Sequence, residues 1–330
     1  MTDKPSIDTL RGLACLLLVG YHVVGADPSS GLHVADGALR TANDALAVLR
    51  MPLFTLLSGV VYGLRPMRGE LGGFLRGKTR RLLLPMLVVG TLFAAVHALT
   101  PGVNQAGVDW RTIHLLPVAH FWFLEALFWI FVAVALLERW QALTSPQAFT
   151  TVMALAIALH LGLRAPHWLA LDGALYLLPY FLAGLAVTRF GLWAWLSRTG
   201  TRVVMAGAAA AALLAIGAPT AHSDRQTVAM LGAGLALCGL ALGSGARSAA
   251  LAWLGRSSYA IYLFHVFFAA AARIALQRAG LDALPMHLAA GLVAGLAGPM
   301  LLERWAAARP WPGRLLLGRS AKLRAVPATH

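Results

Sequence analysis

Long runs of apolar residues alternate with short polar connections along the whole chain. A transmembrane helix needs about 20 mainly apolar residues to cross about 30 Å of hydrocarbon. Ten segments approach this length: roughly 10–26, 45–64, 82–99, 119–138, 148–164, 172–190, 202–218, 227–244, 257–278 and 285–303. Because only helices and closed barrels satisfy their backbone hydrogen bonds in lipid, the pattern predicts an all-α, polytopic membrane helix bundle of about ten transmembrane helices. The connections leave no room for a separate soluble domain, so we expect a single membrane domain over residues 1–330, with a cytoplasmic basic tail at about 304–330.

The composition agrees with a membrane protein. Of the 330 residues, 59% are hydrophobic and 12% are charged, whereas about 25% of the residues of a soluble domain are charged. The two cysteines, Cys15 and Cys238, both lie in apolar segments. We therefore expect neither a disulfide framework nor a metal held by thiolates.

The net charge of +14 is distributed unevenly over the connections. If the N-terminus and alternate connections are placed on one side of the membrane, that side receives twenty of the 27 Lys and Arg residues and the other side receives seven. Cytoplasmic connections carry the excess of Lys and Arg in membrane proteins. The distribution predicts that both termini are cytoplasmic, and it explains the basic charge without any nucleic-acid partner.

Ionisable side chains at bilayer depth are costly, so each is a candidate for function. Arg11 and His22 are eleven residues apart in the first apolar segment. On a helix this spacing places both on one face, with an axial separation of about 16 Å, so His22 lies near the middle of the bilayer. Taken alone, the pair is also compatible with an arginine that snorkels to the surface and a histidine that packs in the core.

The ninth apolar segment carries a second histidine at a similar depth. Ser258, Tyr262 and His265 occupy positions i, i+4 and i+7 of one helix face. His265 lies about 13 Å above Arg256 by helical rise. We expect His265 and His22 to reach the same level of the membrane.

Three further polar groups stand out. His120 and Trp122 begin the fourth segment, where aromatic residues often anchor a helix at the interface, and Glu125 lies deeper and requires a polar partner. Lys78, Arg80 and Arg81 precede the third segment. This basic cluster is typical of a cytoplasmic connection, and it is equally suited to binding phosphates.

Five motifs, in order along residues 7–265, together resemble the membrane-bound acyltransferase family 3, which includes bacterial glycan O-acetyltransferases. The motifs are Asp8-Thr9-Leu10-Arg11-Gly12-Leu13-Ala14 followed by His22; Pro52-Leu53-Phe54 with Leu57-Ser58-Gly59; Lys78 and Arg81 before Leu82-Leu83-Leu84-Pro85; His120-Phe121-Trp122-Phe123-Leu124; and Ser258-Tyr259-Ala260-Ile261-Tyr262-Leu263-Phe264-His265. The chain departs from the family pattern in having lysine at the first position of the basic motif, and no periplasmic hydrolase-like domain is expected after the tenth span.

The resemblance implies an integral enzyme of the bacterial inner membrane that transfers an acyl group, most simply acetyl, from cytoplasmic acetyl-CoA to a hydroxyl of an exported or cell-surface glycan. On this basis His22 is the expected general base, and Arg11 and His265 are further catalytic candidates. Lys78, Arg80 and Arg81 are expected to hold the CoA phosphates. Arg11 is placed to hold a CoA phosphate as well, to help orient the first helix, or to pair with an acidic residue. The residues expected to bind the acceptor are His120, Trp122, Glu125, Ser258 and Tyr262. The acceptor would approach from the outer side, where Asp27, Asp36, Asp44 and Asp109 predict an acidic mouth compatible with a neutral sugar.

Two other classes remain open from the residues alone. A proton-coupled transporter or flippase for a glycan or lipid-linked sugar also uses histidines at bilayer depth, although the repeat symmetry common in transporters is not evident here. A membrane haem protein would use His22 and His265 as axial ligands.

Overall fold

The computed structural model describes residues 7–100, 109–217 and 224–320 and is built from helices. The helices are α1 (Ile7–Val24), α2 (Ala38–Ala45), α3 (Ala47–Leu64), α4 (Leu71–Lys78), the π-helical turn η1 (Thr79–Leu83), α5 (Leu84–Leu99), the 3₁₀ turn η2 (Ala119–Phe121), α6 (Trp122–Arg139), α7 (Pro146–Gly162), the 3₁₀ turn η3 (Trp168–Ala170), α8 (Leu171–Arg189), α9 (Trp193–Leu196), α10 (Thr199–Ile216), α11 (Val228–Gly243), α12 (Ala249–Arg256), α13 (Ser258–Arg278), α14 (Leu284–Ala307) and α15 (Pro310–Leu317).

The predicted all-α membrane bundle is confirmed. Each of the ten apolar segments forms a helix, with ends that differ from the predicted ones by a few residues. Within the described residues, eight helical segments are long and apolar enough to cross a membrane: Ile7–Val24, Ala38–Leu64, Leu71–Leu99, Ala119–Arg139, Trp168–Arg189, Thr199–Ile216, Ser258–Arg278 and Leu284–Ala307. The remaining two predicted spans correspond to shorter apolar helices, Pro146–Gly162 and Val228–Gly243.

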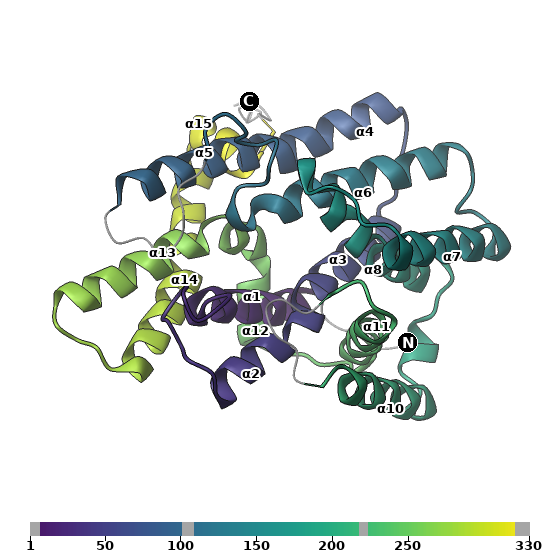
Figure 1. The fold of residues 1–330 in the computed structure, drawn as a ribbon. Helices are drawn as coiled ribbons and strands as arrows, with labels where there is room; N and C mark the ends of the chain where they lie inside the picture. The colour runs from purple at the N-terminus through teal and green to yellow at the C-terminus, as the bar shows by residue number, and fades with distance from the viewer. Residues whose placement is uncertain (1–6, 101–108, 218–223, 321–330) are drawn as a thin grey trace, which may run out of the picture.

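Helix α1 occupies the middle of the bundle (Figure 1), where it packs against α3, α12, α13 and α14. Glycines allow the closest of these approaches. A methyl group on Gly12 would lie 1.8 Å from the backbone oxygen of Leu251, and one on Gly255 would lie 1.8 Å from that of Asp8. Because no side chain fits there, α1 and α12 cross with their backbones in contact, and this contact fixes where α1 places its polar residues.

Two parts of the chain outside the predicted spans contain short helices. The segment before the third span was expected to be a cytoplasmic connection up to residue 81, but Leu71–Leu99 is helical throughout and is interrupted only by the π turn η1. The basic tail at about 304–330 likewise contains the end of α14 and the whole of α15; residues 321–330 lie outside the described part. In both places the short amphipathic helices have too few apolar residues to be recognised as spans.

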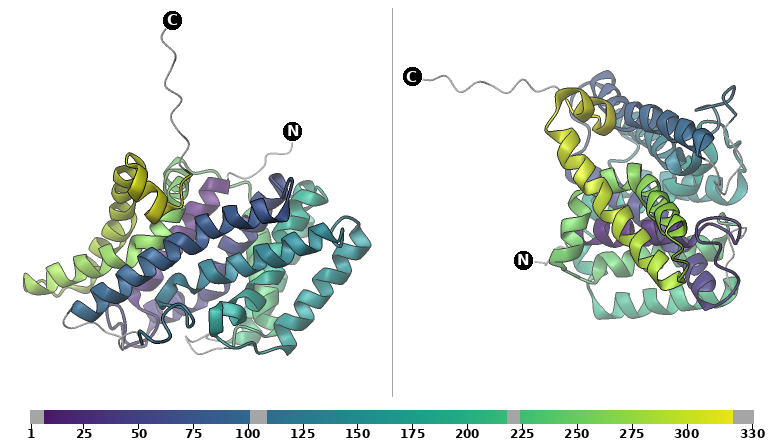
Figure 2. Two further views of the ribbon diagram at one scale, coloured as in Figure 1. Left: turned by 90° about the horizontal axis from the view of Figure 1, so that it is seen from above. Right: turned by 90° about the vertical axis from the view of Figure 1, so that its left-hand side faces the viewer.

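The start of α1 and the C-terminal helix α15 lie at the same end of the bundle (Figure 2). At this end α15 packs against α5, and the backbone oxygen of Arg80 approaches Gly318. The turn that follows α1 (residues 25–32) is at the opposite end, an arrangement that agrees with an even number of membrane crossings.

Candidate active site

Three histidines from separate parts of the chain meet inside the bundle. His22 comes from α1, His120 from η2 at the start of α6, and His265 from α13. Their ring centres are 4.8 Å apart for His22 and His265, 4.9 Å for His120 and His265, and 5.5 Å for His22 and His120. The expectation that His22 and His265 reach the same depth is therefore confirmed, and His120 completes a triangle.

The backbone of α13 fixes the tautomer of His265. Its Nδ1 lies 2.8 Å from the carbonyl oxygen of Ile261 and 3.0 Å from that of Tyr262. Because a carbonyl oxygen can only accept, Nδ1 carries the proton and Nε2 of the neutral ring presents a lone pair. This Nε2 is buried and has no hydrogen-bond partner in the described part of the chain, so it is available to accept a proton or a hydrogen bond.

The three histidines differ in their access to a ligand. His120 and His265 are buried, with exposed fractions of 6% and 0%. The Tyr262 hydroxyl donates to the backbone oxygen of His120 and so ties η2 to α13. His22 is only half-buried and lines a cavity together with His120. A ligand in the cavity therefore has access to His22, with His265 directly behind it.

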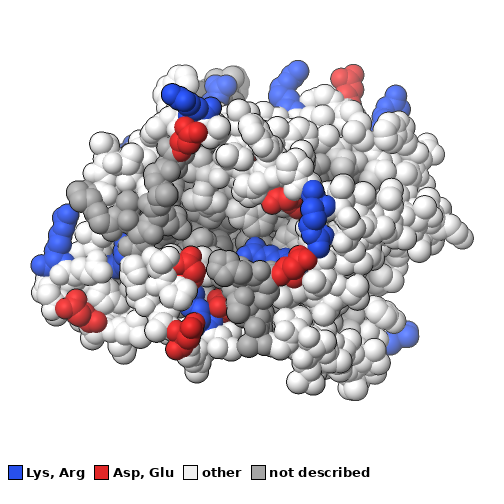
Figure 3. All heavy atoms as spheres, in the orientation of Figure 1, with Lys and Arg blue, Asp and Glu red and all other residues white. Residues whose placement is uncertain are grey.

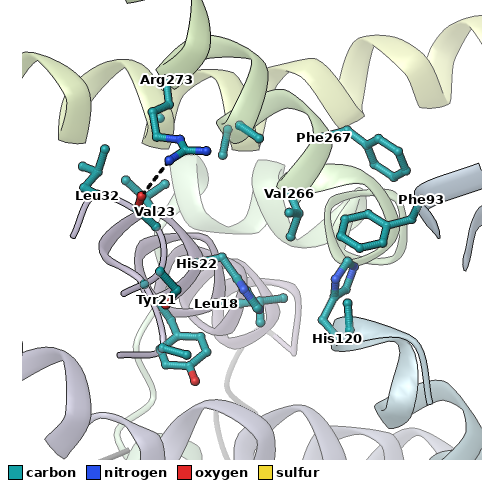
Figure 4. Close-up of a pocket in the computed structure, with 18 of the residues that line it drawn as sticks. Leu18, Tyr21, His22, Val23, Leu32, Phe93, His120, Val266, Phe267 and Arg273 are labelled. Atoms are coloured by element: carbon teal, nitrogen blue, oxygen red, sulfur yellow. Dashed lines mark hydrogen bonds between the residues drawn. The ribbon is translucent and has the colours of Figure 1, made fainter. Parts of the chain in front are cut away.

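The cavity has a volume of about 550 Å³, and its lining includes Gly25, Ser30 and Gly31 of the turn that follows α1. Figure 4 shows His22 and His120 at its base, with Phe93 and Phe267 forming an apolar wall. Of the predicted acceptor-binding residues, His120, Trp122 and Tyr262 line the cavity. This size and mixed lining suit a small organic ligand.

The other two predicted acceptor-binding residues are not part of the lining. Glu125 is buried on α6, and its Oε2 has no hydrogen-bond partner among the described residues. Ser258 begins α13, about 10 Å of helix from His265, and its backbone oxygen accepts a weak hydrogen bond from Cys15 Sγ at 4.0 Å. The geometry assigns neither side chain to the cavity.

The acidic mouth expected from the sequence does not extend into the cavity. Acidic and basic side chains both stand around the hollow in Figure 3, but among the described residues that line the cavity none is acidic and three are arginines, Arg50, Arg225 and Arg273. Asp27 lies on the adjacent turn, where hydrogen bonds from Ser29 lower the pKa of its carboxyl and keep it turned toward its own loop. Sequence counting placed these arginines outside the membrane and gave no reason to bring them together.

The predicted donor-binding residues lie at the other end of the bundle, and none of the four lines the cavity. Arg11 pairs with Asp8 at 3.4 Å. The Lys78 ammonium lies 3.3 Å from the ring centre of Phe131, and Arg80 donates to Ser320 Oγ at 3.4 Å. The backbone oxygen of Arg81 accepts from Tyr259. The basic cluster is thus held on the π turn between α4 and α5, a helical irregularity often found at functional sites.

The haem alternative does not fit this geometry. Axial histidines bind from opposite faces of the macrocycle, whereas the His22 and His265 ring centres are 4.8 Å apart and leave no room for a macrocycle between them. Among the described residues, no group of three or more His, Cys, Asp or Glu side chains is arranged to hold a metal ion.

Comparison with known families gives one match that covers nearly the whole chain. A family model described as an acyltransferase domain, Acyl_transf_3, matches residues 4–304. No curated protein and no solved structure matches the chain.

Proposed function

The chain belongs to acyltransferase family 3, and on that premise we propose that it transfers an acetyl group from cytoplasmic acetyl-CoA to a hydroxyl of an exported or cell-surface glycan in the bacterial inner membrane. That the protein is a multi-pass membrane acyltransferase follows from the family and the helices. The donor, the acyl group, the acceptor and the membrane are the proposed parts.

The observation that carries the proposal is the triangle of histidines, two of which, His22 and His120, line the cavity. A neutral His22 accepts the proton of an acceptor hydroxyl as its oxygen attacks the thioester carbonyl carbon. The new C–O ester bond forms, the C–S bond breaks, and His22 returns the proton to the departing CoA thiolate. General base catalysis of this kind contributes typically about 10²–10⁴-fold to the rate.

His265 supports His22 in this proposal. Its Nδ1 is anchored to the backbone of α13, so Nε2 stays an acceptor beside the His22 ring. The anchored ring can hold His22 or the acceptor hydroxyl in the orientation that attack requires. Tyr262 contributes indirectly, because its hydroxyl fixes the backbone of His120.

The basic end of the bundle supports the choice of donor. Arg11, Lys78, Arg80 and Arg81 lie on the predicted cytoplasmic side, and Arg11 is about 16 Å from the level of His22 by the rise of α1. The phosphates of CoA would bind there, and the long pantetheine arm would carry the thioester inward. Arginine and lysine clusters are the usual protein partners of phosphate groups.

The test is mass spectrometry of the surface glycan from a strain that lacks the gene and carries a restored copy. Wild type and the control variant His167→Ala should restore the acetyl esters, since His167 is an exposed loop residue paired only with Asp172. His22→Ala should insert and express normally but restore none. Full restoration by His22→Ala would remove His22 as the base.

A further inference from the structure

The cavity lining contains more basic residues than expected for the predicted outer side of the membrane, which carries few Lys and Arg residues. Only seven of the 27 Lys and Arg residues belong to the predicted outer side, and three of these, Arg50, Arg225 and Arg273, line the cavity. No lining residue is acidic, and none of the three arginines forms an ion pair within the part of the chain that the structure describes. Three guanidinium groups therefore line the cavity without an ion-pair partner among the described residues.

Arg50 is the most constrained of the three. Its exposed fraction is 4%, its guanidinium donates to Asn43 Oδ1 at 3.3 Å, and its Nε is buried without a hydrogen-bond partner among the described residues. A buried charge without a counter-ion is costly. An anion in the cavity would supply the missing counter-charge.

The neighbouring Arg40 shows what a structural arginine looks like at this end of the bundle. Arg40 donates to the backbone oxygens of Gly25 and Val34 and lies 3.8 Å from the Asp44 carboxylate. Its charge is thus balanced by the protein, and Arg40 is not part of the cavity lining. Arg50 is buried to the same degree, but its partners, the Asn43 amide and the Tyr21 ring, are uncharged.

Arg50 also lies close to the reacting group. Its Cζ is 4.2 Å from the ring centre of Tyr21, and that ring centre is 4.9 Å from the ring centre of His22. One sugar with a charged substituent is long enough to contact both Arg50 and His22. Arg273 of α13 lines the cavity and donates a hydrogen bond to the backbone oxygen of Gly31 (Figure 4), and Arg225 lines it with an exposed side chain.

We propose that the acceptor is an anionic sugar, bearing a carboxylate or a phosphate, whose charge binds Arg50 with help from Arg225 and Arg273 while its hydroxyl lies at His22. This inference deepens the acyl-transfer function and rests on it. Arginine suits the role because its planar guanidinium makes paired hydrogen bonds to either anion.

The experiment measures binding of three probes to the purified full chain in the absence of acetyl-CoA. The probes are methyl β-glucuronide, glucose 6-phosphate and the neutral methyl β-glucoside, and calorimetry gives each Kd. At least one anionic probe should bind about tenfold or more tightly than the neutral one, the gain expected for a charge-assisted pair; which anion binds identifies carboxylate or phosphate as the recognised group. Equal binding of all three probes, or of none, would overturn the proposal.

Three variants assign the binding to the cavity. Arg50→Gln should abolish the preference for the anion, and Arg278→Gln, an exposed arginine of α13 outside the lining, should keep it. Arg225→Gln should weaken anion binding severalfold. Because the Arg225 side chain is exposed, we expect this variant to fold, and it tests the anion site if Arg50→Gln does not fold. An unchanged anion preference in both cavity variants would overturn the proposal.

Acetyl transfer to the same probes, measured separately with acetyl-CoA, distinguishes a failure of the acyl-transfer function from a failure of the anionic-acceptor proposal. Anion binding at Arg50 without any acetyl transfer would count against the acyl-transfer function and leave the anion site standing. Transfer to the neutral glucoside as fast as to the anions, unaffected by Arg50→Gln, would support the enzyme and overturn the anionic acceptor.

Discussion

The three histidines of the cluster differ in what holds each ring, and this difference supports the roles proposed for them. His265 is anchored through Nδ1 to two backbone oxygens and is fully buried, so its ring cannot turn toward a ligand. His22 has no such anchor and lines the cavity. The accessible ring is the better proton acceptor for an incoming hydroxyl, and the fixed ring is the better positioning group.

The variant His265→Asn tests this division. The Asn amide nitrogen can replace Nδ1 as the donor to Ile261 and Tyr262, whereas nothing replaces Nε2. We expect the thermal midpoint in detergent to fall little and kcat to fall about tenfold or more, with a smaller change in KM, because orientation matters chiefly in the transition state. His265→Ala, which loses both nitrogens, should lose stability as well. An unchanged kcat in His265→Asn would leave His265 with a structural role only.

Residue patterns predicted some of this site and not the rest. The depth of His22 and His265 follows from counting helical turns from cytoplasmic basic residues, because both lie within long regular helices. His120 lies on a 3₁₀ turn, and its approach to the other two rings depends on how α6 meets α13, which no local pattern records. Arg50 was counted only as an outer charge, since a single apolar segment cannot show what packs around its end.

At the scale of helices, close backbone contact explains a motif that carries no chemistry of its own. Helices α3 and α8 cross where a methyl group on Gly59 would lie 2.0 Å from the backbone oxygen of Phe181, and one on Gly184 would lie 2.0 Å from that of Leu56. Small residues at such crossings let membrane helices pack closely. The Leu57-Ser58-Gly59 motif therefore acts by holding α3, and with it Arg50, at a fixed distance from α8.

Replacing Gly59 should separate these two helices. Gly59→Leu forces the α3 and α8 backbones apart, and overpacking of this kind costs about 1–3 kcal/mol. Gly207→Ala on α10 is the matched control, since nothing lies within 4 Å of its added methyl group. Thermal unfolding in detergent should show a lower midpoint for Gly59→Leu and no loss for Gly207→Ala. Equal midpoints would mean that the crossing is not tightly packed.

The molecule as a whole separates two kinds of basic residue at its two ends. Arg11, Lys78, Arg80 and Arg81 belong to the end that holds the start of α1 and α15, and Arg50, Arg225 and Arg273 line a cavity that includes the turn at the end of α1. The Lys and Arg distribution predicted the first group as cytoplasmic. The second group lies on the predicted outer side, where basic residues are few. Only the folded structure shows that its three members line one cavity. A donor and an acceptor that are both anionic can thus bind on opposite sides of the His22 level.

The most direct test is the initial rate of acetyl transfer when labelled acetyl-CoA is supplied to only one face of sealed vesicles that contain the full chain. Transfer should occur when the donor is on the face of the basic cluster, and it should be absent in His22→Ala. In the double variant Arg80→Ala, Arg81→Ala, the KM for acetyl-CoA should rise about tenfold or more with little change in kcat, because the lost charges bind the donor and do not take part in the reaction. Transfer from donor supplied only to the cavity face, or an unchanged KM in the double variant, would contradict a CoA site at the basic end.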